Sequence, residues 1–144
     1  MHRRVSLLFL VVIMATLFTI ACGSAGSTRP AGIAAPEVRA ELVGTVFFGS
    51  GNTAPANIDV WVTNRATVPI VLRRVEVDSP GMATYSIRRT TRLVRETVAP
   101  GETKRVTVFA TAFTNVSNPS EPLTLRTIAE FEAGKDRWRE VVMR

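Results

Sequence analysis

Two pairs of carboxylates have a spacing that suits acid–base chemistry. Glu76 and Asp78 form one pair, and Glu130 and Glu132 form the other. Residues two apart on a strand share a face and lie about 7 Å apart, which suits a hydrolytic acid pair or half of a calcium site. The alternative is that all four are solvated residues on the outer face of a sheet. A hydrolase that uses paired carboxylates is therefore one of two functional hypotheses.

The side chains required by most other mechanisms are missing from the greater part of the chain. The one histidine, His2, and the one cysteine, Cys22, both lie near the N-terminus, and Gly49-Ser-Gly51 lacks the pattern of a phosphate-binding loop. A Ser-His-Asp triad, a Cys-His site, an ordinary zinc site and an internal disulfide are thus excluded beyond Cys22. We predict no catalytic residue, no metal and no cofactor.

Arginine dominates the basic residues, which give the chain a formal charge of +6. Six arginines come from adjacent segments, and together they predict a basic patch that binds phosphate or carboxylate groups in a bidentate manner. The alternative is that they protect an edge strand from aggregation. The candidate patch consists of Arg73, Arg74, Arg88, Arg89, Arg92 and Arg95.

Trp61 is the candidate exposed aromatic. In the segment Asn57–Asn64, Ile58, Val60 and Val62 alternate with polar residues, and Trp61 falls on the polar phase. Trp61 is therefore either a recognition residue on the outer face or a residue covered by a loop.

The N-terminal segment has the plan of a signal peptide: residues 1–4 are basic, residues 5–20 are apolar, and a small residue precedes Cys22. Residues 18–22, Phe-Thr-Ile-Ala-Cys, resemble the bacterial lipobox. The resemblance implies that the signal peptide, residues 1–21, is removed and that Cys22 becomes the lipid-modified N-terminus. An uncleaved anchor helix is the alternative.

Lipidation at Cys22 would place the rest of the chain outside the cytoplasm, attached to a membrane by its acyl chains. Gly23, rather than Asp, follows the cysteine. By resemblance to the sorting of such proteins, this favours the periplasmic side of the outer membrane in a double-membraned bacterium. The expected partners are the membrane and an envelope protein or anionic envelope polymer, and nucleic acid is not expected.

The remainder divides into a tether and one domain. Residues 23–36 are small and rich in glycine and proline, so we expect residues 22–36 to form a flexible tether. From Glu37 the apolar residues recur every second position, and no helical period persists for more than about two turns. Residues 37–144 therefore predict an all-β, immunoglobulin- or fibronectin-III-like sandwich of about seven antiparallel strands. The strands are expected near residues 38–48, 57–64, 68–77, 83–87, 106–110, 123–132 and 137–143.

The third of these strands changes phase. Ile70 and Leu72 occupy even positions, whereas Val75 and Val77 occupy odd ones. A regular strand cannot bury both pairs on one face, so we predict a β-bulge at Arg73-Arg74.

Three segments resemble, in their order, the water-stress and hypersensitive-response domain of late-embryogenesis-abundant proteins. They are Ile58–Asn64, which ends in Thr-Asn, Val68–Ile70, which contains Pro-Ile, and Val98–Thr103, which contains a Pro-Gly turn. Other immunoglobulin-like envelope modules share the Ala-Pro-Gly-Glu-Thr turn. The resemblance implies a non-enzymatic protective or scaffold role and transfers no catalytic residue. The second functional hypothesis is accordingly a membrane-anchored binding, scaffold or protective module.

Overall fold

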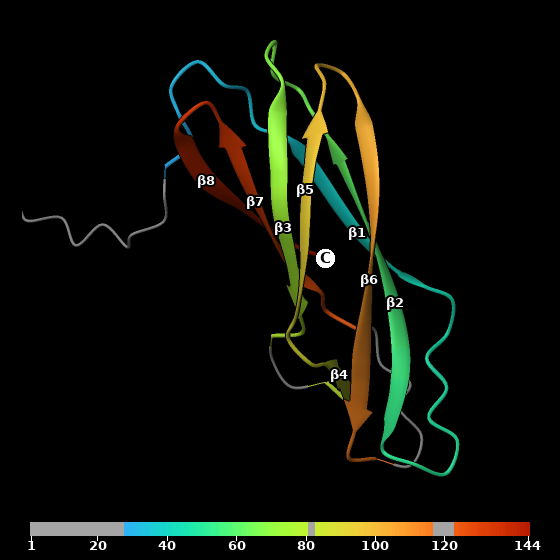
Figure 1. Cartoon of the computed structure of the whole chain (residues 1–144). Coiled ribbons are helices and arrows are strands. Elements are labelled where there is room, and N and C mark those ends of the chain that lie inside the picture. The colour runs from blue at the N-terminus through green and yellow to red at the C-terminus, as the bar shows by residue number, and fades with distance from the viewer. Residues whose placement is uncertain (1–27, 81–82, 117–122) are drawn as a thin grey trace, which may run out of the picture.

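Two four-stranded antiparallel sheets pack face to face in the computed structural model, which describes residues 28–80, 83–116 and 123–144 (Figure 1). Sheet A has the order β1-β2-β6-β4, and sheet B has the order β5-β3-β7-β8. The described residues contain no helix, which confirms the predicted all-β sandwich. The strands are β1 Glu37–Val43, β2 Thr53–Thr63, β3 Ile70–Asp78, β4 Tyr85–Ile87, β5 Thr90–Val98, β6 Thr103–Thr114, β7 Arg126–Ala133 and β8 Asp136–Met143.

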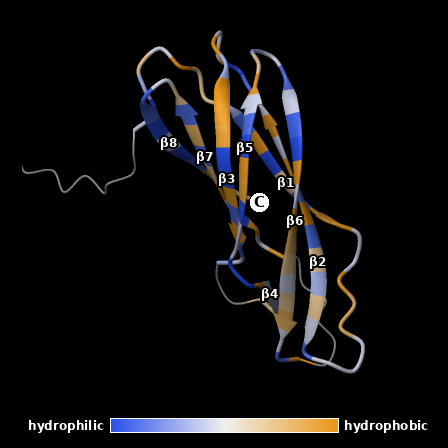
Figure 2. Cartoon of the chain, in the orientation of Figure 1, coloured by the Kyte–Doolittle hydropathy of each residue, from blue (hydrophilic) through white to orange (hydrophobic). Residues whose placement is uncertain are grey.

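The core lies between the sheets and follows the predicted alternation. Ile58, Val60 and Val62 on β2 are fully buried, because successive side chains of a strand point to opposite faces. Phe131 on β7 stacks on Trp138 on β8 with their ring centroids 5.6 Å apart. In Figure 2, β8 is largely hydrophilic, whereas the part of β6 beside β4 is more apolar.

The described residues form eight strands, not seven, because the basic segment after β4 continues into a strand of its own. Most of β5 is exposed on both faces. β5 is the edge strand of sheet B, so it does not have to bury every second side chain in order to pair with its neighbour. The inward and outward periodicity that predicts a strand is consequently weak in its sequence.

β2 begins at Thr53, four residues before the expected strand 57–64. Pro55 lies opposite Thr111 of β6, whereas the pairing of β2 with β1 stops at Asn57. Pro55 is therefore at a free edge on its β1 side, where a proline without an N–H is tolerated.

The predicted bulge in β3 is present. Leu72 pairs with Phe131 of β7 and Arg74 pairs with Glu130, the residue directly before Phe131, so Arg73 has no partner of its own on β7. The extra residue lets Leu72 and Val75 both point into the core, where both are buried. Arg73 and Arg74 both form ion pairs with glutamates of β7.

A second irregularity lies between β3 and β5. Leu72 pairs with Glu96 and Arg74 pairs with Leu93, so two residues of β5 lie opposite one residue of β3. One of the two, Arg95, has a positive φ of 60°, a conformation that residues with a Cβ seldom adopt. β5 is thus bent at its middle.

Candidate functional site

Cys22 and the first part of the expected tether lie outside the described residues. Among the residues that the structure does describe, none belongs to a helix long and apolar enough to cross a membrane.

The carboxylate pair on β7 faces arginines from both neighbouring strands. The pKa of Glu132 is lowered, chiefly by its hydrogen bond from Arg137 and then by Arg73. A general acid at neutral pH requires the opposite shift. Glu130 and Glu132 both form ion pairs with arginines of the neighbouring strands of sheet B. The pairs are Glu132 with Arg73 (2.6 Å) and Arg137 (2.8 Å), and Glu130 with Arg74 (3.1 Å) and Arg139 (3.4 Å).

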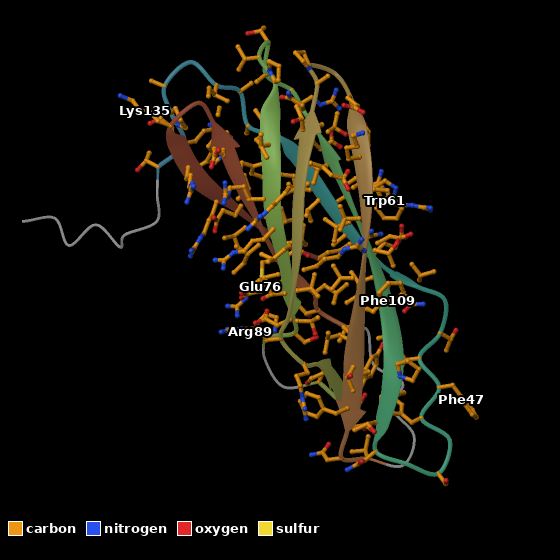
Figure 3. The ribbon with its side chains drawn as sticks, in the orientation of Figure 1. Phe47, Trp61, Glu76, Arg89, Phe109 and Lys135 are labelled. Atoms are coloured by element: carbon orange, nitrogen blue, oxygen red, sulfur yellow. The ribbon has the colours of Figure 1, made fainter. Side chains whose placement is uncertain are left out.

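The carboxylate pair on β3 is also engaged by arginines. Arg126 donates to Asp78 from Nε at 2.8 Å, and Arg89 lies 3.3 Å from Asp78 and 3.4 Å from Glu76 (Figure 3). The hydrogen bond from Arg126 is the main cause that lowers the pKa of Asp78. Within the described ranges, no three His, Cys, Asp or Glu residues form a group that could hold a metal ion.

The structure divides the six candidate arginines into two groups. Arg73, Arg74 and Arg89 form the ion pairs just described. The other three form no ion pair with a carboxylate in the part of the chain that the structure describes, and all three are exposed. These three, which we name the seam arginines, are Arg88, Arg92 and Arg95.

The seam arginines follow the side of the sandwich where β5 of sheet B approaches β6 of sheet A. The backbone N–H of Arg88 donates to the carbonyl of Thr111 at 2.9 Å. The guanidinium of Arg92 donates to the carbonyl of Thr107. These contacts fix the chain beside β6 and leave the cations at the surface.

Trp61 lies on the outer face of sheet A and is half-buried. Its direct cross-strand neighbours are Arg39 on β1 and Arg105 on β6. The guanidinium carbon of Arg39 lies 5.9 Å from the centroid of the indole, within cation–π range. Figure 3 shows Trp61 on the same side of the sandwich as the exposed Phe109. An arginine therefore covers part of the ring.

A hollow of about 490 Å³ opens beside Trp61. Arg65 forms an ion pair with Glu37 on its wall, and the hydroxyl groups of Thr63 and Thr103 lie 2.8 Å apart. The volume falls in the range of about 300–1,000 Å³ that is usual for small-ligand sites. The residues that line it are Glu37, Arg39, Trp61, Thr63, Arg65, Gly101 and Thr103.

Asn64 holds the backbone at the end of this hollow, and we did not predict its role from the sequence. Its side chain is fully buried. Its amide donates to the carbonyls of Val68 at 2.8 Å and Val98 at 2.9 Å, and its oxygen accepts from the N–H of Ala66 at 2.8 Å. The N–H of Gly101 donates to the carbonyl of Asn64 at 2.9 Å. One residue thus connects three segments of the chain.

These are the same three segments that carry the resemblance to the water-stress domain. Asn64 ends the first, Val68 begins the second, and Val98 begins the third. Residues of these three segments therefore meet at Asn64, whereas in the sequence Asn64 indicated only the end of a strand.

No protein-family model and no curated protein matches the chain. Solved structures similar to it include a protein from Archaeoglobus fulgidus, with 16% identity, covering 75% of this chain and 90% of that chain at a TM-score of 0.45. Another is a FixG-related protein from Vibrio parahaemolyticus, with 11% identity, covering 75% of this chain and 93% of that chain at a TM-score of 0.37.

Proposed function

We propose that this chain is a lipoprotein of the bacterial cell envelope, anchored through Cys22, whose β-sandwich binds anionic envelope material without catalysis. The lipobox-like residues before Cys22 support the anchor, and Gly23 favours the periplasmic side of the outer membrane where the organism has one. The observation that carries the binding role is the exposed set of seam arginines, whose charges no carboxylate of the described residues neutralises.

The seam arginines continue into a strip of polar contacts across sheet A. Arg92 donates to the carbonyl of Thr107, whose hydroxyl donates to Asp59 at 2.5 Å. Asp59 also lies 3.7 Å from Arg105, the direct neighbour of Trp61. Such a strip suits an extended anionic partner better than a small one, because guanidinium groups spaced along a surface pair with successive carboxylates or phosphates.

The binding role is tested by cosedimentation of residues 28–144 with phosphatidylglycerol vesicles and with phosphatidylcholine vesicles. We expect binding to the anionic vesicles alone, weakened by salt because the Debye length is about 8 Å at physiological ionic strength. Changing the seam arginines together to Gln removes up to about 3 kcal/mol, or about a hundredfold in affinity at low salt.

A control variant with the same change in net charge separates location from charge. The control changes three basic residues at the turn before β8 and on β8 itself, namely Lys135, Arg137 and Arg139. Changing these three residues together to Gln is expected to leave most of the vesicle binding. If both triple variants lose affinity equally, or if the seam variant binds like the wild type, the seam arginines are edge protection for β5 and the binding proposal is wrong.

The anchor is tested separately by mass spectrometry of the N-terminus in the native host. We expect an acylated chain that begins at Cys22, and a Cys22→Ser variant that accumulates as an unprocessed precursor. An unmodified chain that begins at Met1 in the wild type would exclude lipidation.

A further inference from the structure

The hollow beside Trp61 combines chemical groups that suit a sugar. Its lining offers one aromatic ring, two hydroxyl groups, two guanidinium groups and one carboxylate. A pyranose ring has an apolar C–H face that packs against an indole and a rim of hydroxyl groups that exchange hydrogen bonds with Thr63 and Thr103. A purely apolar ligand would leave the charged lining without partners.

Arg39 is the group in the hollow that is free to bind an anion. It forms no ion pair with a carboxylate of the described residues, and its guanidinium carbon lies over the Trp61 ring, 5.9 Å from the centroid. A cation–π contact uses none of the N–H groups of a guanidinium, so they stay available to match the two oxygens of a carboxylate. Trp61 is only half-buried, so part of the indole stays accessible beside this cation.

The charges of the hollow leave one positive charge for the ligand. Arg65 pairs with Glu37, and this contact lowers the pKa of Glu37, which keeps its carboxylate ionised and able to accept hydrogen bonds from hydroxyl groups. Arg39 attracts the same carboxylate more weakly, so the two guanidinium groups and the one carboxylate of the lining leave a net charge of +1. One carboxylate on each sugar unit would complement this balance, whereas a doubly charged group would be poorly matched.

We propose that the Trp61 hollow binds a uronic-acid unit of an acidic glycan, with the sugar ring against Trp61 and its carboxylate on Arg39. This inference rests on the proposed binding role and names a ligand class for it. The strip through Arg105 and Asp59 connects the hollow to the seam arginines, so a longer acidic chain would reach both.

The test uses the full chain purified in detergent, with trigalacturonate and its neutral methyl ester as probes. Trp138 is fully buried and is the only other tryptophan, so a change in indole fluorescence reports on Trp61. Calorimetric titration provides a second readout for the variants. We expect the acid to bind at least tenfold more tightly than the ester.

Arg39→Gln is expected to abolish the difference between acid and ester, and Trp61→Ala to weaken the binding of both. Arg139→Gln, on the outer face of sheet B, is the matched control and should change neither. The proposal is overturned if the ester binds as tightly as the acid, if Arg39→Gln has no effect, or if inorganic phosphate displaces the probe as well as the acid does. Loss of vesicle binding in the seam variant with probe binding retained would separate this site from the seam.

Discussion

Asn64 is the residue whose replacement tests the structure most directly. We consider Asn64→Ala, which keeps the backbone and removes the three side-chain hydrogen bonds to Val68, Val98 and Ala66. The position is fully buried, so water cannot easily replace the lost partners. The carbonyl of Val98 loses the donor that the buried amide provides.

The size of the effect follows from the number of bonds. Each intramolecular hydrogen bond contributes about 1 kcal/mol net, and a buried group left without a partner costs more. Asn64→Ala should therefore lower the free energy of unfolding by about 3 kcal/mol, a large share of the roughly 5–15 kcal/mol of an ordinary domain. For about 100 residues this corresponds to a fall in Tm of roughly 12 °C.

Urea unfolding of residues 28–144, followed by tryptophan fluorescence as the buried Trp138 becomes exposed to water, measures this change from the midpoint and the slope. Asn57→Ala is the matched control, because Asn57 lies on β2, the strand that Asn64 directly follows, and is exposed. The control should change the stability by less than about 0.5 kcal/mol. If the two variants unfold at the same urea concentration, the central role of Asn64 is refuted.

Three further predictions concern the core, the bent edge strand and the charges on sheet B. Val60→Asp places an unpaired carboxylate at a fully buried position and should cost several kcal/mol, whereas Thr63→Asp on the outer face should cost little, as thermal melting will show. Arg95 has a φ of 60°, so Arg95→Gly should stabilise the domain by up to about 1 kcal/mol and Arg95→Val should destabilise it in urea titrations. The pKa of Asp78 is lowered by Arg126, so its contribution is fully present above its unfolded pKa of about 3.9 and is lost as the pH falls through its lower folded value. The free energy of unfolding measured from pH 6 to pH 2 should therefore fall less steeply for Asp78→Asn than for the wild type.

Period-two alternation was sufficient to predict much of the fold. Where a strand has one face in the core, as β2 does at Val60 and Val62, alternation identifies the strand and its inward face. The bulge at Arg73 was predictable for the same reason, because both Leu72 and Val75 must be buried. β5 lacks a buried face along most of its length, and the same signal therefore fails there.

The candidate site was less predictable, because its contacts join residues far apart in sequence. The pairing of Arg39 with Trp61 depends on the register between β1 and β2, which alternation does not specify. The neutralisation of Arg73 and Arg74 depends on the position of β7 beside β3. The sequence supplies the residue types, whereas topology decides which arginines meet a carboxylate.

The register of sheet B has a geometrical consequence for the whole sandwich. One row of paired residues contains Leu72, Phe131 and Glu96, and the next contains Arg74, Glu130 and Leu93. Between these two rows, β7 has no intervening residue, β3 has one, and β5 has two. The two rows therefore lie farther apart at β5 than at β7, because more residues of β5 separate them. A sheet with one long margin must curve, and the long margin here is the one that contacts β6 of the opposite sheet (Figure 1). The lengths of the three strands are consequently linked. At this point β5 has one residue more than β3. Removing Arg73 alone would raise this difference to two residues, and removing Arg95 as well would return it to one.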